Sequence, residues 1–312
     1  MIGAGGQLGT ELTQSLANTY GNEAVIATDF QESAQSKFTY CRFKTLDVLD
    51  KEAVKKLLQE EQITQVYHLA AILSANGEKN PMHTWDMNIR GLLNVLELAR
   101  ECAIEKLFWP SSIAVFGPNT PKKNTPQDAF KNPTTVYGIS KLAGEHWCEY
   151  YFNTYGVDVR SLRFPGLIGY KSIAGGGTTD YAVDIYHKAI QKENYTCFLQ
   201  EDSYLPMMYM DDAVHAILQL MAAPASDIQI RTSYNLSGMS FSPREIAESI
   251  QSFYPSFQVK YVPDFRQKIA DSWPSSINDD SARSDWGWKA QYDLPKMTSE
   301  ILTKLPSYIH KI

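Results

Sequence analysis

Tyr137 and Lys141 stand four residues apart in the segment TVYGISKLAGE, and this spacing can support proton transfer. In a helix, residues four apart lie on one face, a single turn from each other. Tyrosine alone is a poor base, since its ordinary pKa is about 10. A lysine ammonium one turn away stabilises the phenolate and is expected to lower that pKa. The pair therefore predicts a base that takes the proton of an alcohol while a hydride leaves the same carbon.

A serine pair supplies a second candidate group. The segment WPSSIAVFGP, residues 109–118, places two serines after a strand-like stretch and before a Gly–Pro turn. The hydroxyl of Ser111 or Ser112 can donate a hydrogen bond to the alcohol oxygen or to the oxyanion that develops on it. Serine-rich turns and Tyr–Lys pairs are each common by themselves. Their occurrence together, in this order along one chain, is what indicates a site.

The glycine run GAGGQLG near the N-terminus predicts a loop that binds dinucleotide phosphates. Gly3, Gly6 and Gly9 are spaced three apart, which suits a tight turn, close approach to pyrophosphate and close helix packing. Twenty residues after Gly9, the strand-like VIATD ends in Asp29. A carboxylate at that place accepts the ribose hydroxyls and repels a 2′-phosphate, so we expect NAD rather than NADP.

The strand that feeds this loop is expected to be short. Only Met1 and Ile2 precede Gly3, whereas strands usually contain about five or six residues. A strand in that position is central in its sheet. We therefore expect the natural chain to begin upstream of Met1, which a longer upstream reading frame would support.

Alternating strand and helix patterns in the first half of the chain position these groups. Short apolar runs predict strands, with helical stretches between them, at 24–30, 65–71, 106–110 and 157–164. Asp50 suits the cap of one helix and Gly156 the end of another. Such alternation predicts a Rossmann-type, doubly wound parallel α/β sheet, with its ligand crevice at the carboxyl ends of the strands. We expect an NAD-binding domain over 1–165 and mainly a smaller substrate-binding lobe over 166–312, with some segments returning to the sheet.

Composition argues against several classes of protein. The net charge of −6 and the lack of a basic face disfavour nucleic acid as a partner. No apolar run approaches the roughly 20 residues that cross a membrane, so no membrane partner is expected. The four cysteines lack pairing spacing and the N-terminus is unlike a secretory signal, so we expect reduced thiols and a cytoplasmic location. The six histidines form no HxxxH pair and no CxxC occurs, so no metal site is expected.

Together these segments resemble the extended short-chain dehydrogenase/reductases. The similarity is carried by GAGGQLG, VIATD, LDVLD, YHLAA, WDMNIRGLLNVLE, SSIAVFG, YGISK, RFPGLIG and YMDDAVHAI, which span nearly the whole chain. The resemblance implies a catalytic trio of Ser112, Tyr137 and Lys141. It also implies that NAD is bound by Gly3, Gly6, Gln7, Leu8, Asp29, Asp47, Val48, Leu69, Ala70, Ala71, Asn88, Tyr137, Lys141, Pro165 and Leu167. Phe116, where the family more often has tyrosine, is a departure.

The substrate-side segments AAILSANGEKNP, GGGTTDYAVDIYHKAI, LPMMYMDDA and DFRQKIADSWPSSI resemble those of short-chain-type L-threonine 3-dehydrogenases. This resemblance implies that NAD oxidises the C3 hydroxyl of L-threonine to give 2-amino-3-oxobutanoate, with Ser112 and Tyr137 on the reacting oxygen. The amides and hydroxyls of the glycine–threonine run, at the start of a helix, can hold the substrate carboxylate. The expected substrate contacts there are Ser74, Gly177, Thr178 and Thr179. The alternative for this run is a mobile loop without a ligand role.

Other functions share this fold. An NAD-dependent nucleotide-sugar epimerase or reductase of the same extended family would be the main alternative, and epimerases retain NAD through the cycle. A non-catalytic dinucleotide sensor commonly lacks the tyrosine or the lysine, and this chain has both. Members of the family often pair through two long helices, here expected at 82–103 and 137–156. A homodimer with a four-helix interface is therefore expected.

Overall fold

The computed structural model describes residues 1–171 and 173–308, and a parallel sheet lies at its centre. Four of its strands pair in the order β3-β4-β5-β9, all parallel: β3 (Gln65–Tyr67), β4 (Lys106–Ser112), β5 (Val159–Phe164) and β9 (Tyr234–Asn235). A separate parallel pair joins β1 (Ile26–Asp29) to β2 (Arg42–Thr45). Ile2 lies between the two sets and bridges both Thr28 and His68. The first strand is thus reduced to a single bridging residue, as expected.

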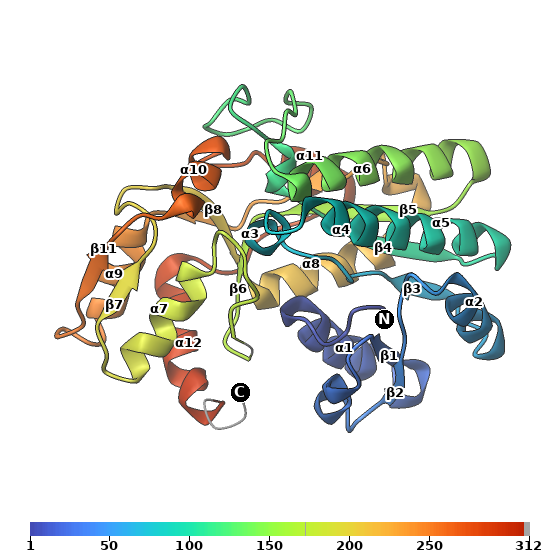
Figure 1. The fold of residues 1–312 in the computed structure, drawn as a ribbon, viewed down its shortest axis with the longest axis horizontal. Helices are drawn as coiled ribbons and strands as arrows, with labels where there is room; N and C mark the ends of the chain where they lie inside the picture. Colours follow the sequence, from blue (N-terminus) through green and yellow to red (C-terminus); the bar gives the residue numbers. More distant parts are fainter. Residues whose placement is uncertain (172, 309–312) are drawn as a thin grey trace.

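Helices cover both faces of this sheet, which confirms the doubly wound arrangement. Figure 1 shows α4, α5 and α6 side by side over β4 and β5, with α8 on the opposite side. α8 also packs against α1. The helices of this part are α1 (Gln7–Tyr20), α2 (Lys51–Glu60), α3 (Ser74–Gly77), α4 (Pro81–Trp85), α5 (Gly91–Glu101), α6 (Val136–Tyr155) and α8 (Met210–Ala222).

Local signals set the ends of these helices. The Asp50 side chain accepts a hydrogen bond from the amide of Ala53 and caps α2. Gly156 ends α6 with φ of 72°, a left-handed conformation in which glycine has no Cβ penalty. Both predicted helix ends are confirmed.

A π-helical turn separates two of the helices. Residues 82–103 were expected to form one helix, and the structure instead has α4, a π turn at Asp86–Arg90, and α5. Such turns often occur at functional sites because they redirect a side chain within an otherwise regular helix. Here the turn contains Asn88, one of the expected cofactor residues.

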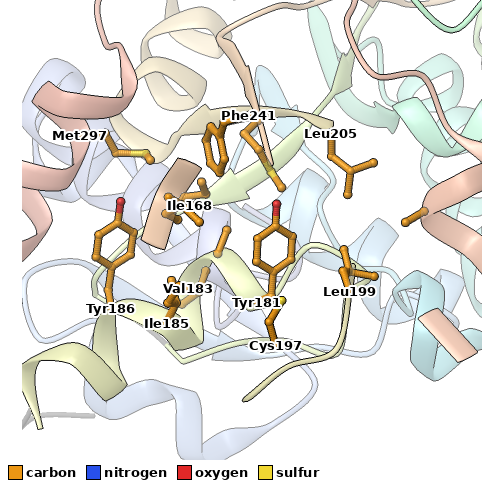
Figure 2. Packing of buried hydrophobic residues seen from close by; sticks show 14 of the residues in the cluster. Ile168, Tyr181, Val183, Ile185, Tyr186, Cys197, Leu199, Leu205, Phe241 and Met297 are labelled. Carbon is orange, nitrogen blue, oxygen red and sulfur yellow. The ribbon is translucent and has the colours of Figure 1, made fainter. Parts of the chain in front are cut away.

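Most C-terminal elements, here called the second lobe, pack around a buried cluster that also includes residues 113–116. Its strands are β6 (Gly166–Ile168), β7 (Tyr195–Cys197), β8 (Leu205–Tyr209), β10 (Met239–Phe241) and β11 (Val259–Tyr261). Its helices are α7 (Tyr181–Ile190), α9 (Pro243–Gln251), α10 (Phe265–Ser272) and α12 (Leu294–Lys304). α11 (Asp280–Trp286) instead packs against β9 of the main sheet. Figure 2 shows side chains of α7, β8 and β10 meeting in this core, including Tyr181, Tyr186 and Phe241. The lobe also returns to the main sheet, because β9 pairs with β5.

Several strands were missing from the sequence prediction, and β2 and β6 show why. β2 has the sequence RFKT and is mostly exposed, so it lacks the apolar pattern that marks a strand. β6 lies in the glycine-rich stretch after residue 165 and is three residues long. β6 forms a strand because it pairs with β8, for example Leu167 with Met208, and not because of its local sequence.

Candidate active site

The glycine loop between Ile2 and α1 is shaped for close backbone approach. Gly3 has φ of +81°, and a Cβ there would lie 2.5 Å from the amide nitrogen of Ala70. A Cβ at Gly9 would lie 2.5 Å from the Gly3 carbonyl oxygen. In contrast, the nearest atom to a Cβ at Gly6 is 3.8 Å away, so Gly6 faces open space at the start of α1. The loop leaves helix amides facing that space, as a phosphate cradle requires.

Asp29 lies at the end of β1 beside this loop. Its Oδ2 accepts a hydrogen bond of 2.8 Å from the Gly5 amide, and its Oδ1 accepts one of 3.1 Å from the Gln31 amide. Lys37 donates a 2.9 Å hydrogen bond to the Gly5 carbonyl from the other side. The carboxylate is therefore anchored next to the phosphate loop, where it can receive a ribose, so the residues present fit a bound dinucleotide.

The other expected cofactor residues border the carboxyl ends of the strands. Asp47 and Val48 follow β2, where Asp47 accepts a 2.9 Å hydrogen bond from the Leu49 amide. Three further residues form the loop after β3, namely Leu69, Ala70 and Ala71. Ile72 follows this loop and is held by the Asn88 side chain. That side chain accepts a hydrogen bond from the Ile72 amide at 2.8 Å and donates one to the Ile72 carbonyl at 3.1 Å.

Four further expected cofactor residues lie elsewhere, two just after β5 and two at the start of α1. Pro165 connects β5 to β6, and Leu167 lies within β6. Leu8, in the first turn of α1, packs partly against the cluster beneath the main sheet. The Gln7 side chain reaches outside the glycine loop and donates a 2.8 Å hydrogen bond to the carbonyl of Ile173. It thereby ties the loop to the segment that precedes α7.

The structure distinguishes the two candidate serines. Ser111 is buried, and its hydroxyl donates a 2.6 Å hydrogen bond to Glu145 Oε1. Ser112 is half-buried at the end of β4 and forms a side-chain hydrogen bond with Tyr137. Ser112 is thus the serine that lies next to the candidate base, Tyr137.

Tyr137 and Lys141 lie one turn apart near the start of α6, and Thr135 caps that helix. Burial raises the pKa of Tyr137 to about 12, and the hydrogen bond with Ser112 acts in the opposite direction. Burial also lowers the pKa of Lys141 to about 7. The expected net lowering of the Tyr137 pKa is therefore wrong, because burial of the phenol raises it. Desolvation disfavours the phenolate and the ammonium alike.

The predicted substrate loop reaches the end of β3 from the second lobe. Ser74, in α3, and Thr178 are 104 positions apart in sequence, yet their hydroxyl oxygens are 3.3 Å apart and both residues are buried. Thr179 lies beside β6, close to Gly166. Two of the expected substrate residues are therefore brought together by tertiary structure.

The expected carboxylate cradle is differently arranged. The amides of Gly176 and Gly177 both donate to Asp180 Oδ2, at 2.6 and 2.7 Å. An internal carboxylate thus binds the amides that the sequence offered to a substrate carboxylate, and Gly177 is not available as predicted. The neighbouring hydroxyls of Ser74 and Thr178 are then the predicted polar groups that could contact a substrate there.

A buried ion-pair network behind the site was not predicted. Arg163, in β5, donates to both carboxylate oxygens of Glu145, in α6, at 2.8 Å each. Glu145 also accepts the Ser111 hydroxyl, so one carboxylate joins α6, β4 and β5. The sequence signal was the presence of arginines in the strand-like segment VDVRSLRF, because a buried arginine needs a partner.

Comparison with known proteins identifies the family. The model of the NAD dependent epimerase/dehydratase family matches residues 1–237. The chain belongs to this family, and it is an extended short-chain dehydrogenase/reductase. An uncharacterized epimerase/dehydratase of Staphylococcus saprophyticus is 49% identical over 304 residues, covering 97% of this chain and 95% of the relative.

Solved structures of L-threonine dehydrogenases are similar over nearly the whole chain. The holo form of the GalE-like enzyme from Cupriavidus necator has 53% identity and a TM-score of 0.96, covering 97% of this chain and 98% of that one. A monomeric L-threonine 3-dehydrogenase from a metagenome, in its apo form, has 50% identity and a TM-score of 0.94, covering 98% of each chain. The family and these neighbours imply an enzyme with a nicotinamide cofactor.

The described part of the chain also bears on membranes and metals. Among residues 1–171 and 173–308, no helix combines the length and apolar character needed to span a bilayer. Within the same part of the chain, no three His, Cys, Asp or Glu side chains gather as a metal-binding group.

Proposed function

We propose that this enzyme oxidises the C3 hydroxyl of L-threonine with NAD, giving 2-amino-3-oxobutanoate. The observation that carries the proposal is the similarity to L-threonine dehydrogenases through both lobes, at 50% identity or more. The meeting of Ser74 and Thr178 at the substrate side supports it, because paired hydroxyls suit a small polar substrate.

Each residue has a distinct part in the proposed reaction. Bound NAD, held by the glycine loop and Asp29, supplies the acceptor for the hydride that leaves C3. Tyr137 Oη takes the proton of the C3 hydroxyl, and Ser112 orients that hydroxyl by a hydrogen bond. Lys141, as an ammonium, favours the phenolate form of Tyr137. Since burial raises the pKa of Tyr137 to about 12, this positive charge is needed at neutral pH.

Substitution of the base tests the mechanism. Tyr137→Phe is expected to lower the L-threonine-dependent formation of NADH at 340 nm by about 10²–10⁴-fold, the usual range for losing general-base catalysis. NAD affinity, measured by calorimetry, should change little because the glycine loop is intact. Tyr150→Phe, an exposed tyrosine on the same helix, is the matched control and should keep its rate. Retention of a near wild-type rate by Tyr137→Phe would contradict the assignment of the base.

A substrate panel distinguishes the alternative reaction. L-threonine, L-serine, allo-threonine and UDP-glucose are each incubated with the enzyme and NAD. Net NADH that grows with turnover on L-threonine supports the proposal. Turnover of UDP-glucose without net NADH would instead indicate an epimerase.

We further propose that the enzyme is a homodimer through α5 and α6. Three aromatic side chains of α6 are between 39% and 47% exposed and pack on one another, namely Trp147, Tyr150 and Tyr155. An exposed aromatic patch of this kind is typical of a protein–protein interface. Light scattering after gel filtration should give twice the mass of 35.2 kDa, and Trp147→Lys should halve it. A monomeric wild-type protein would refute the dimer.

A further inference from the structure

Lys141 lies against the face of an indole inside the protein. Its Nζ is 4.4 Å from the centroid of the Trp109 ring and 5.6 Å from that of Tyr137. The same Nζ donates a 2.6 Å hydrogen bond to the carbonyl of Pro110. Trp109 and Lys141 are only 2% and 3% exposed. At this distance and in a buried position, the negative face of the ring attracts the ammonium.

Helix α6 leaves room for this indole. Gly144 lies three residues after Lys141, on the same side of α6. A Cβ at Gly144 would lie 2.4 Å from Cη2 of Trp109 and 2.7 Å from Cζ2. A side chain there would displace the ring. Glycine is unfavourable within a helix, so its presence in the middle of α6 indicates that the space is needed.

The charged and titratable groups around Lys141 provide little negative charge to stabilise its ammonium. Burial lowers the pKa of Lys141 to about 7, while Cys148 and Glu145 act in the opposite direction. Glu145 is already paired with Arg163, and burial raises the pKa of Cys148 so that its thiol stays neutral. His68, from the end of β3, is also neutral because burial lowers its pKa to about 3.

Tyr137 is the remaining titratable neighbour. Its pKa is raised, so at neutral pH it is a phenol that adds no negative charge beside Lys141. The indole face and the Pro110 carbonyl are then the electron-rich groups in contact with Nζ.

We propose that Trp109 is a positioning residue for Lys141: its ring fixes the ammonium beside Tyr137 and favours the charged form. Trp109 acts through Lys141 and not on the substrate. Because the ammonium serves the base Tyr137, the inference rests on the proposed function for its catalytic meaning. The effect on Lys141 itself is independent of any substrate.

The decisive experiment follows Lys141 directly. In protein labelled with ¹³C-lysine, the Cε chemical shift is titrated with pH, and the resonance of Lys141 is identified by its loss in Lys141→Met. Trp109→Leu should lower the midpoint of Lys141 by about one pH unit, since it removes a buried cation–π contact. Trp109→Phe keeps a smaller aromatic face and should lower the midpoint less. This second variant also decides the matter if Trp109→Leu does not fold.

A neighbouring aromatic residue provides the control. Phe108 precedes Trp109 in β4, is fully buried and packs in a different cluster with Tyr67 and Phe164. Phe108→Leu should destabilise the protein without moving the midpoint of Lys141. An unchanged midpoint in the Trp109 variants, or an equal shift in Phe108→Leu, would overturn the proposal.

Turnover adds a second readout. If the wild type forms NADH from L-threonine, the alkaline loss of activity should move to lower pH in Trp109→Leu by the same amount, since Lys141 then loses its proton earlier. If the wild type does not use L-threonine, the proposed function fails. The titration of Lys141 still decides the role of Trp109 in that case.

Discussion

The carboxylate of Glu145 provides the sharpest test of how the site is held. Glu145 and Arg163 are each 1% exposed, and two hydrogen bonds of 2.8 Å join them. Glu145→Gln keeps the shape of the side chain but removes its charge. The guanidinium would then have neutral acceptors, Gln127 O at 2.9 Å and Asn235 Oδ1 at 3.0 Å.

The expected cost follows from that arrangement. Breaking a buried pair by removing one charge usually destabilises a protein by about 3–5 kcal/mol, because the other charge stays buried. Since glutamine still offers one oxygen to Arg163, we expect the lower end, about 3 kcal/mol, in the free energy of unfolding. Activity should fall as well, because Glu145 links α6, which carries Tyr137, to β4, which carries Ser112.

Urea titrations followed by circular dichroism measure this loss. The matched control is Asp86→Asn, which breaks an exposed i,i+4 pair with Arg90 and should cost about 0.5 kcal/mol or less. Arg163→Met in the Glu145→Gln background should restore part of the stability, because no unpaired charge is left. A loss below about 1 kcal/mol for Glu145→Gln, or strictly additive effects in the double variant, would refute the reasoning.

Two further predictions concern the substrate side and pH. Thr178→Val removes the hydroxyl that lies 3.3 Å from Ser74, so steady-state assays should show a KM for L-threonine raised by about tenfold with unchanged NAD affinity; an unchanged KM would argue against this pocket. His68 has a pKa lowered to about 3 in the folded chain from an ordinary 6.5, so the unfolded chain binds more protons between these values. Its contribution to stability should therefore be complete above about pH 6.5 and fall as pH drops toward 3, and a His68→Gln variant should show a shallower acid loss in urea titrations than the wild type.

The sequence by itself determined the features that depend on local pattern. The glycine spacing, the acid at the end of β1, the Tyr–Lys pair on one helix and the alternation of strands and helices are each set within a few residues. Their consequences are backbone conformation and side-chain direction, which follow from neighbours along the chain. The Rossmann-type fold and the ends of α2 and α6 were predicted on these grounds.

The tertiary structure decided what depends on burial and on residues distant in sequence. It distinguished the two candidate serines, because the Ser111 hydroxyl donates to Glu145 and Ser112 does not. It also placed Asp180 where its carboxylate accepts from the amides of the glycine–threonine run. It also reversed the expected shift of the Tyr137 pKa, because the same burial that joins Tyr137 to Lys141 desolvates both. Desolvation depends on what the whole chain packs around a group, and no spacing within a single helix reports it.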